Sequence, residues 1–305
     1  MQKIGNDKVC YAMSARNKPV AEVKPGECFT VATEDCYGGR LRTKHDIFTK
    51  EMWDTVNPAT GPILVQGAQP GAILRIDVKT IKVRNHAVMC VERKSGALGD
   101  FIEGVETTII PIRQGRLNVR SGLAIPLRPM IGVIGTAPRK GVIPNGTPGE
   151  HGGNMDCREI TAGSSVYLPV NVPGALLCLG DLHALMGDGE VCICGAEVAG
   201  EITLRTALVH SFLPTPCVRT RDGISFIGSA GSLDTCERIV LGKAHRFLTG
   251  TAHLKPNEAA RLMSLAGTLG VCQVVDPLKT MRFSLPLCLL SKLGVRFPVD
   301  RPHRS

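Results

Sequence analysis

The residues best suited to chemistry lie in one short segment, residues 180–190, which reads GDLHALMGDGE and directly follows an apolar run. Asp181 and His183 are two positions apart, so in extended backbone their side chains point to the same side and could bind one metal ion. A divalent cation with an open coordination position lowers the pKa of its bound water to about 7, which supplies hydroxide at neutral pH. Glu190 lies past two flexible glycines and could accept the proton as general base.

A third ligand is expected from the glycine-rich segment of residues 135–156, which contains six glycines and three prolines in 22 residues. This composition disfavours a regular element, and a linker or a loop that forms a site would both fit it. The segment ends in His151, Asn154 and Asp156 among glycines, which favours a site-forming loop. Asp156 is the third ligand candidate, and His151 is its reserve and a catalytic candidate.

The same residues also have a purely structural interpretation. Asp181 and Asp188 could cap turns, and His183 could bond a backbone carbonyl, because the Asp-x-His pattern is short and common. Spacing alone leaves both interpretations open. Elsewhere, Asp35-Cys36 could present a nucleophilic thiol, but no base lies nearby in the sequence, so a turn with a buried cysteine is favoured.

Most of the secondary structure that the sequence predicts around these residues consists of β-strands. Residues 72–79 alternate apolar and polar side chains with period two, which predicts a half-buried strand. Helical patterns are limited to a short stretch at 46–53 and a longer one that begins near Asn257. We therefore expect a mainly β to α+β fold, with a β-rich N-terminal barrel or sandwich domain over 1–134. A C-terminal α+β domain over 135–305 would carry the glycine loop, the GDLHALMGDGE segment and one or two late helices. The other expected strands lie at 28–32, 63–66, 87–91, 107–111, 166–172, 175–179, 190–194, 202–210 and within 271–286.

Composition excludes several classes of protein. The chain has 305 residues, 36 Lys+Arg against 27 Asp+Glu, and 43% hydrophobic positions, which is a globular composition with a modest net charge of +9. The basic residues are scattered apart from a tail at 296–304, and no aromatic residues interleave them, so nucleic acid is not an expected partner. The first 25 residues contain no apolar stretch, so we expect a cytoplasmic protein with no membrane partner. Its 12 cysteines are then expected to be reduced.

Taken in order, the motifs resemble those of the acetamidase/formamidase family. The resemblance spans roughly residues 25 to 290, and several ordered motifs are more specific than any single one. The matching segments are Asp35-Cys36, NPATGPI at 57–63, GAQPG at 67–71, PMIGVIG at 129–135, HGGNMD at 151–156, GDLHA at 180–184 with Gly189-Glu190, and QVVDP at 273–277. One departure is Ala72, where relatives often carry an acidic residue.

The resemblance implies a hydrolase, an amidase that cuts small linear amides such as formamide and acetamide to carboxylate and ammonia. It implies a divalent metal at Asp156, Asp181 and His183, with Zn²⁺ the best fit and Ca²⁺ or Mn²⁺ as alternatives. Glu190 would act as base and then as acid, and Asn154 or backbone N–H groups would stabilise the oxyanion. A homodimer or higher homo-oligomer is also implied.

Two alternatives stay open beside this interpretation. One is a lactamase-like hydrolase of a cyclic or larger amide on the same scaffold. The other is a family member without catalytic activity, in which an oxygen-ligated Ca²⁺ braces the loops, with four carboxylates available, those of Asp156, Asp181, Asp188 and Glu190.

Overall fold

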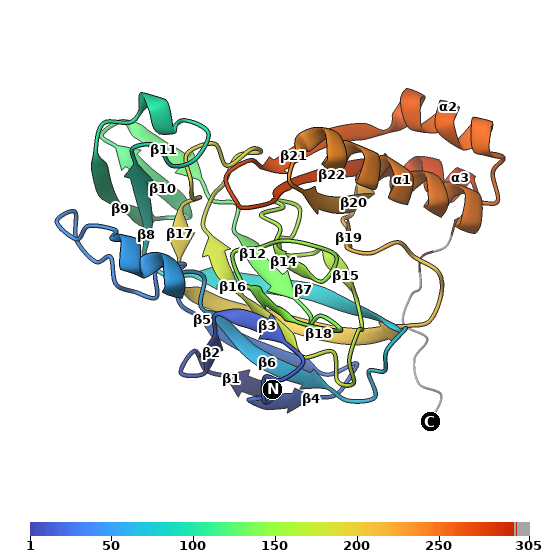
Figure 1. The fold of residues 1–305 in the computed structure, drawn as a ribbon, viewed down its shortest axis with the longest axis horizontal. Helices are drawn as coiled ribbons and strands as arrows, with labels where there is room; N and C mark the ends of the chain where they lie inside the picture. The colour runs from blue at the N-terminus through green and yellow to red at the C-terminus, as the bar shows by residue number, and fades with distance from the viewer. Residues whose placement is uncertain (296, 298–305) are drawn as a thin grey trace.

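Strands are the predominant regular element of the molecule, as the alternating side chains predict. The computed structural model describes residues 1–295 and 297, whose strands form two large sheets and a separate two-stranded pair (Figure 1). The strands are β1 (Gln2–Ile4), β2 (Val9–Cys10), β3 (Ala12–Ser14), β4 (Ala21–Val23), β5 (Cys28–Thr33), β6 (Ala59–Val65), β7 (Ile73–Val83), β8 (His86–Glu92), β9 (Val105–Arg113), β10 (Arg116–Arg120), β11 (Leu123–Pro126), β12 (Met130–Gly135), β13 (Val142–Pro144), β14 (Gly152–Asn154), β15 (Ser165–Pro169), β16 (Leu177–His183), β17 (Glu197–Val198), β18 (Gly200–Val209), β19 (Cys217–Arg219), β20 (Gly223–Ala230), β21 (Thr268–Gln273) and β22 (Lys279–Pro286). The helices are α1 (Leu233–Thr251), α2 (Pro256–Ala266) and α3 (Leu287–Lys292), with 3-10 turns η1 (Lys50–Thr55) and η2 (Gly99–Phe101).

The two large sheets enclose the main core. One sheet has the order β1-β5-β18-β7-β15-β19-β20-β22-β21, and the other runs β11-β10-β9-β8-β17-β16-β12-β14 with β2, β4 and β6 attached beside β16. Apolar side chains from both sheets, such as Leu74 of β7 and Leu179 of β16, are fully buried in one cluster. A second cluster lies where α1, α2 and α3 gather beside β20–β22 at one end of the molecule (Figure 1).

The expected fold class is confirmed, because the chain is β-rich and its helices come late. The helix expected near Asn257 is α2, which begins one residue earlier with Pro256 in its first turn. The division at residue 134 stays a prediction. Strand pairing joins the two parts, because β7 pairs with both β15 and β18 and β12 pairs with β16.

Three local expectations are wrong. The apolar run at 190–194 forms a turn, since Ile193 has a φ of +128°, which a strand does not allow. The stretch at 46–53 yields only the 3-10 turn η1. Regular structure also enters the glycine segment, as the short strands β13 and β14.

No helix among the described residues is long and apolar enough to cross a membrane. Apart from residue 297, the basic tail at 296–304 lies outside the described residues.

Two residues of the polar face of β7, Arg75 and Asp77, are buried, although the alternating pattern predicts a solvent-facing row. Asp77 is 4% exposed and lies beside Ser165 of β15 and Arg205 of β18 in the strand register. Its Oδ1 accepts a hydrogen bond from the Ser165 hydroxyl at 2.7 Å. The guanidinium groups of Arg75 and Arg205 contact its two oxygens at 2.7 and 2.9 Å. Asp77 therefore links three central strands of the first sheet.

We expect Asp77→Asn to lower the free energy of unfolding at pH 7 by about 3 kcal/mol, since it removes the buried carboxylate that both Arg75 and Arg205 contact. Burial raises the pKa of Asp77, but the hydrogen bonds from Ser165 and Arg205 and the Arg75 charge outweigh it, so the pKa lies below its ordinary 3.8. The carboxylate therefore stabilises the fold above that value, and the contribution is lost as the pH falls through the folded-state pKa. Urea unfolding at several pH values measures this; an equal difference between the two proteins at neutral and acidic pH would contradict it.

Candidate active site

A cavity of about 540 Å³ lies where segments distant in the sequence meet around β16. The described residues that line it include Asn154, Asp181, His183, Glu190, Glu197 and Asp276, together with Cys36 and the aromatic side chains of Tyr37, Phe48 and Trp53. None of these described lining residues is Lys or Arg. Carboxylates are thus concentrated in a cavity whose wall supplies no lysine or arginine charge to balance them.

The end of β16 places two of the predicted ligands. β16 is buried along its whole length and pairs with β12 on one side and β17 on the other. His183 is its last residue, and Asp181 lies two positions before it. The Oδ1 atom of Asp181 lies 3.6 Å from Nε2 of His183. The two side chains therefore meet, as their spacing predicts.

Three further carboxylates surround the His183 ring. Its Nε2 atom lies 3.1 Å from Oε1 of Glu197 and 3.7 Å from Oδ1 of Asp156. On the other side of the ring, Nδ1 lies 3.9 Å from Oε1 of Glu190. The structure thus brings together all three predicted ligands and the predicted base, and it adds Glu197.

Backbone strain is concentrated at these acids. Asp156, Asp181 and Glu190 have φ values of +43°, +56° and +46°, in the left-handed region that residues other than glycine seldom adopt. Such conformations cost about 1–3 kcal/mol each and persist where the surrounding structure enforces them, which is most often at functional sites. The strained backbone conformations of these three residues therefore accompany the placement of their carboxylates in one cluster.

The electrostatics of the cluster are dominated by burial. Burial and the charge of Asp276 raise the pKa of Asp156 well above its ordinary value, and burial with the Asp156 charge does the same for Glu190. Burial and the charge of Asp181 likewise raise the pKa of Glu197. For His183, burial favours the neutral ring, but the Asp181 charge and hydrogen bond outweigh it and raise the pKa above 6.5. Protons or a cation must balance these groups.

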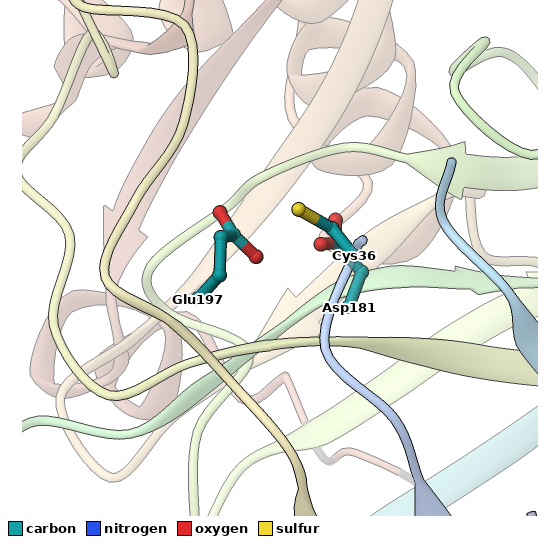
Figure 2. Close-up of side chains that lie close together, drawn as sticks. All are labelled: Cys36, Asp181 and Glu197. Carbon is teal, nitrogen blue, oxygen red and sulfur yellow. The ribbon is translucent and has the colours of Figure 1, made fainter. Parts of the chain in front are cut away.

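Two groups of side chains have the geometry to bind a cation. Asp156, His183 and Glu190 form one, and Cys36, Asp181 and Glu197 form the other; within each group the ligand atoms lie within 4.8 Å of one another, and all the residues are buried. Figure 2 shows the second group, with the Glu197 carboxylate facing the Cys36 sulfur and the Asp181 carboxylate. Several ligand atoms are buried without a hydrogen-bond partner: Oδ1 of Asp156, Oδ1 of Asp181, Nδ1 of His183, Oε2 of Glu190 and Oε2 of Glu197. This donor set fits a divalent cation.

Of the two remaining predicted site residues, Asn154 lies at the cavity and His151 does not. Asn154 lines the cavity, and a hydrogen bond from its side chain to Asp276 lowers the pKa of that carboxyl, although burial raises it further. His151 packs instead against Gly149 and Gly153 outside the lining of the cavity, where burial lowers its pKa to about 4. The structure therefore does not bring His151 into the cluster.

Asp188 lies outside the cluster as well, although it belongs to the same sequence motif. Its oxygens accept two hydrogen bonds from Arg282, both at 2.8 Å, and its side chain is 38% exposed. The calcium alternative counted Asp188 among its carboxylates, and that part of the alternative is wrong.

Sequence reasoning missed Glu197 and Asp276 and treated Cys36 as structural. Glu197 stands in a run of small apolar residues, AEVA at 196–199, and a lone acid in such a run was a usable signal. The turn expected at Asp35-Cys36 is present, because Oδ1 of Asp35 accepts the N–H groups of Tyr37 and Gly39 at 2.9 and 3.0 Å. Cys36 is buried as expected, but it faces the carboxylates.

Comparison with known families identifies the family of this chain. The family model described as Acetamidase/Formamidase family matches residues 16–147 and 143–220, which is more than half of the chain. The chain belongs to the acetamidase/formamidase family. This match confirms the resemblance in the motifs and the expectation of an amidase that acts on carbon–nitrogen bonds other than peptide bonds.

Relatives of this family member include a formamidase from Methylophilus methylotrophus, 28% identical over 68% of this chain and 69% of that protein. A protein of Schizosaccharomyces pombe named as a formamidase is 26% identical over 63% of this chain, which spans 62% of the length of that protein. Among solved structures, an acetamidase from Bacillus halodurans has 42% identity and a TM-score of 0.94, over 96% of this chain and 100% of that one. A gamma lactamase from Delftia acidovorans, at 21% identity and a TM-score of 0.64, shares the fold.

Proposed function

We propose that this family member hydrolyses small linear amides to a carboxylate and ammonia in the cavity around His183. The observation that carries the proposal is the buried cluster of Asp156, Asp181, His183 and Glu190, several of whose polar atoms have no hydrogen-bond partner. Asp156, Asp181 and His183 would hold a divalent cation. Carboxylate oxygens combined with an imidazole nitrogen suit Zn²⁺ or Mn²⁺ better than Ca²⁺, which prefers oxygen ligands alone.

The chain's own residues would then move the proton and hold the substrate. When bound, the cation polarises the amide carbonyl and lowers the pKa of water to about 7. The Glu190 carboxylate takes the proton of the attacking water and returns it to the leaving nitrogen, because ammonia leaves only when that nitrogen is protonated. Burial and the Asp156 charge raise the pKa of Glu190, which favours its protonated form and so its role as the acid toward the leaving nitrogen. Asn154 has a second N–H beside the one on Asp276, and it would stabilise the oxyanion by about 3 kcal/mol.

Metal removal tests the proposal. We expect the purified protein to release ammonia from formamide or acetamide, to lose this activity after treatment with a chelator, and to regain it with added Zn²⁺. Undiminished turnover in protein shown to be free of metal would contradict the role of the cation. No ammonia from any amide, together with a large drop in thermal stability on chelation, would instead favour the alternative in which the metal only braces the loops.

The size of the cavity favours a second candidate, hydrolysis of a larger amide. Formamide has three non-hydrogen atoms, whereas cavities of about 300–1,000 Å³ accommodate ligands of drug size. One wall is aromatic, with the rings of Tyr37 and Phe48 5.6 Å apart and those of Phe48 and Trp53 4.9 Å apart. The same ammonia assay with benzamide and phenylacetamide distinguishes the two candidates, and ring opening of a γ-lactam tests the cyclic alternative. The cytoplasmic location and the homo-oligomer stay predictions.

A further inference from the structure

The cavity contains more acidic groups than one divalent cation can balance. Five carboxylates interact there, those of Asp156, Asp181, Glu190, Glu197 and Asp276, because each shifts the pKa of at least one of the others. One imidazole, that of His183, accompanies them, and no Lys or Arg is found among the described lining residues. A single cation of charge +2 therefore leaves a negative excess that protons or a further cation must balance, because unpaired buried charge is expensive in a medium of low dielectric constant.

Part of this excess lies at one side of the cluster, where a soft ligand is available. Cys36, Asp181 and Glu197 are 7%, 2% and 1% exposed, and their ligand atoms lie within 4.8 Å of one another. Oδ1 of Asp181 and Oε2 of Glu197 are buried there without a hydrogen-bond partner. Cys36 is a free thiol that the Asp35 turn holds in place opposite the Glu197 carboxylate (Figure 2).

These three residues come from three parts of the fold, and one of them, Asp181, is shared with the cation site of the proposed function. Cys36 follows β5, Asp181 lies in β16, and Glu197 begins β17, which pairs with β16. Glu197 is further fixed by the backbone N–H of Gly195, which donates to its Oε1 at 3.0 Å. Its Oε2 is buried without a hydrogen-bond partner. The group thus has a rigid scaffold and a ligand set of one sulfur and two carboxylates.

We propose that Cys36, Asp181 and Glu197 bind a second divalent cation of the thiophilic class, such as Zn²⁺, so that the cavity is a two-cation centre. Binding converts the Cys36 thiol to a thiolate, and its proton is released to solvent. The thiolate ligand selects Zn²⁺ or Co²⁺ over Mg²⁺ and Ca²⁺. The inference rests on the cation site of the proposed function, but it concerns binding and does not depend on which amide is cleaved.

Cobalt substitution tests the inference without any assay of turnover. We expect metal-depleted protein reloaded with Co²⁺ and dialysed to retain two ions per chain and to show a sulfur-to-cobalt charge-transfer band in the near ultraviolet. Cys36→Ser should lose the band and retain one ion, because the first group does not use Cys36. Cys36→Ala should behave in the same way. Far-ultraviolet circular dichroism confirms that both variants are folded.

Cys194→Ser is the matched control. Cys194 lines the same cavity and is equally buried, but its thiol donates to the backbone oxygen of Cys90 at 3.4 Å and belongs to neither group. This variant should keep both ions and the band. One cobalt per chain in the unaltered protein, or a band that survives in Cys36→Ser, overturns the inference. If the protein binds two cobalt ions and shows a Cys36-dependent band but cleaves no amide, the proposed function is contradicted and this inference is supported.

Discussion

An Asp181→Asn protein is expected to fold and to release ammonia from its amide substrate about 10³-fold more slowly than the unaltered protein, or slower still. The carboxylate of Asp181 lies 3.6 Å from His183 and also belongs to the group with Cys36 and Glu197. An amide of the same shape keeps the volume but removes the negative charge and one anionic ligand. We therefore expect lower metal content together with the lost turnover. Steady-state kinetics and elemental analysis of the dialysed protein measure the two effects.

Asp188→Asn is the matched control, because it changes the same residue type in the same sequence motif. Asp188 is half-exposed and held by Arg282 outside the cluster. Losing a partly exposed ion pair costs about 1 kcal/mol of stability at most, and we expect turnover and metal content to stay within about twofold of the unaltered protein. Equal losses of turnover in Asp181→Asn and Asp188→Asn would mean that the motif serves the stability of the fold and not the reaction. Normal turnover in Asp181→Asn would contradict the assignment of Asp181 to the active site.

The part of this site that the sequence predicts consists of residues whose spacing along one segment places them together. Asp181 and His183 lie on one strand, so a period of two is enough to place them together. Asp156 ends the glycine-rich segment, whose strand β14 pairs with β12, and its own backbone is held in the left-handed region. Glu197 and Cys36 reach the cluster through strand pairing and through a turn after β5, and such long-range contacts leave no periodic signal. Sequence reasoning therefore finds one side of the cluster and misses the side that carries the sulfur.

The errors in the predicted fold have a similar origin. No helix is expected between the stretch at 46–53 and the one near Asn257, yet α1 begins at Leu233, where Ser232 caps it by accepting the N–H of Thr235 at 3.2 Å. The helical spacing of Cys236, Val240 and Ala244, all fully buried, was present as a signal. At 190–194 the apolar pattern is equally strand-like, but tertiary contacts of the cluster override it.

We expect Gly132→Ala to weaken metal binding and to lower turnover by about 10²-fold, the effect that misplacing reacting groups by about 1 Å can have. Gly132 lies in β12, a strand buried along its whole length behind the carboxylates. A Cβ atom built on it would lie 2.5 Å from Oδ1 of Asp156, 2.5 Å from Oδ2 of Asp181 and 2.9 Å from the Asp181 backbone oxygen. These carboxylates are buried and come from strained backbone, so they cannot swing away without leaving the cluster. Only glycine lets β12 approach both.

Gly187→Ala is its control, since a Cβ atom there meets nothing within 4 Å and the residue has no left-handed φ. The comparison requires metal titration, turnover at saturating metal and a thermal midpoint for each variant. A Gly132→Ala protein that binds metal and turns over normally would show that the carboxylates tolerate displacement, and the cluster would then lack the rigidity that the proposed chemistry needs. If the variant instead binds metal much more weakly while its thermal midpoint changes little, the close approach of β12 serves metal binding. The glycine at position 132 is then explained by the space that the metal-binding carboxylates require.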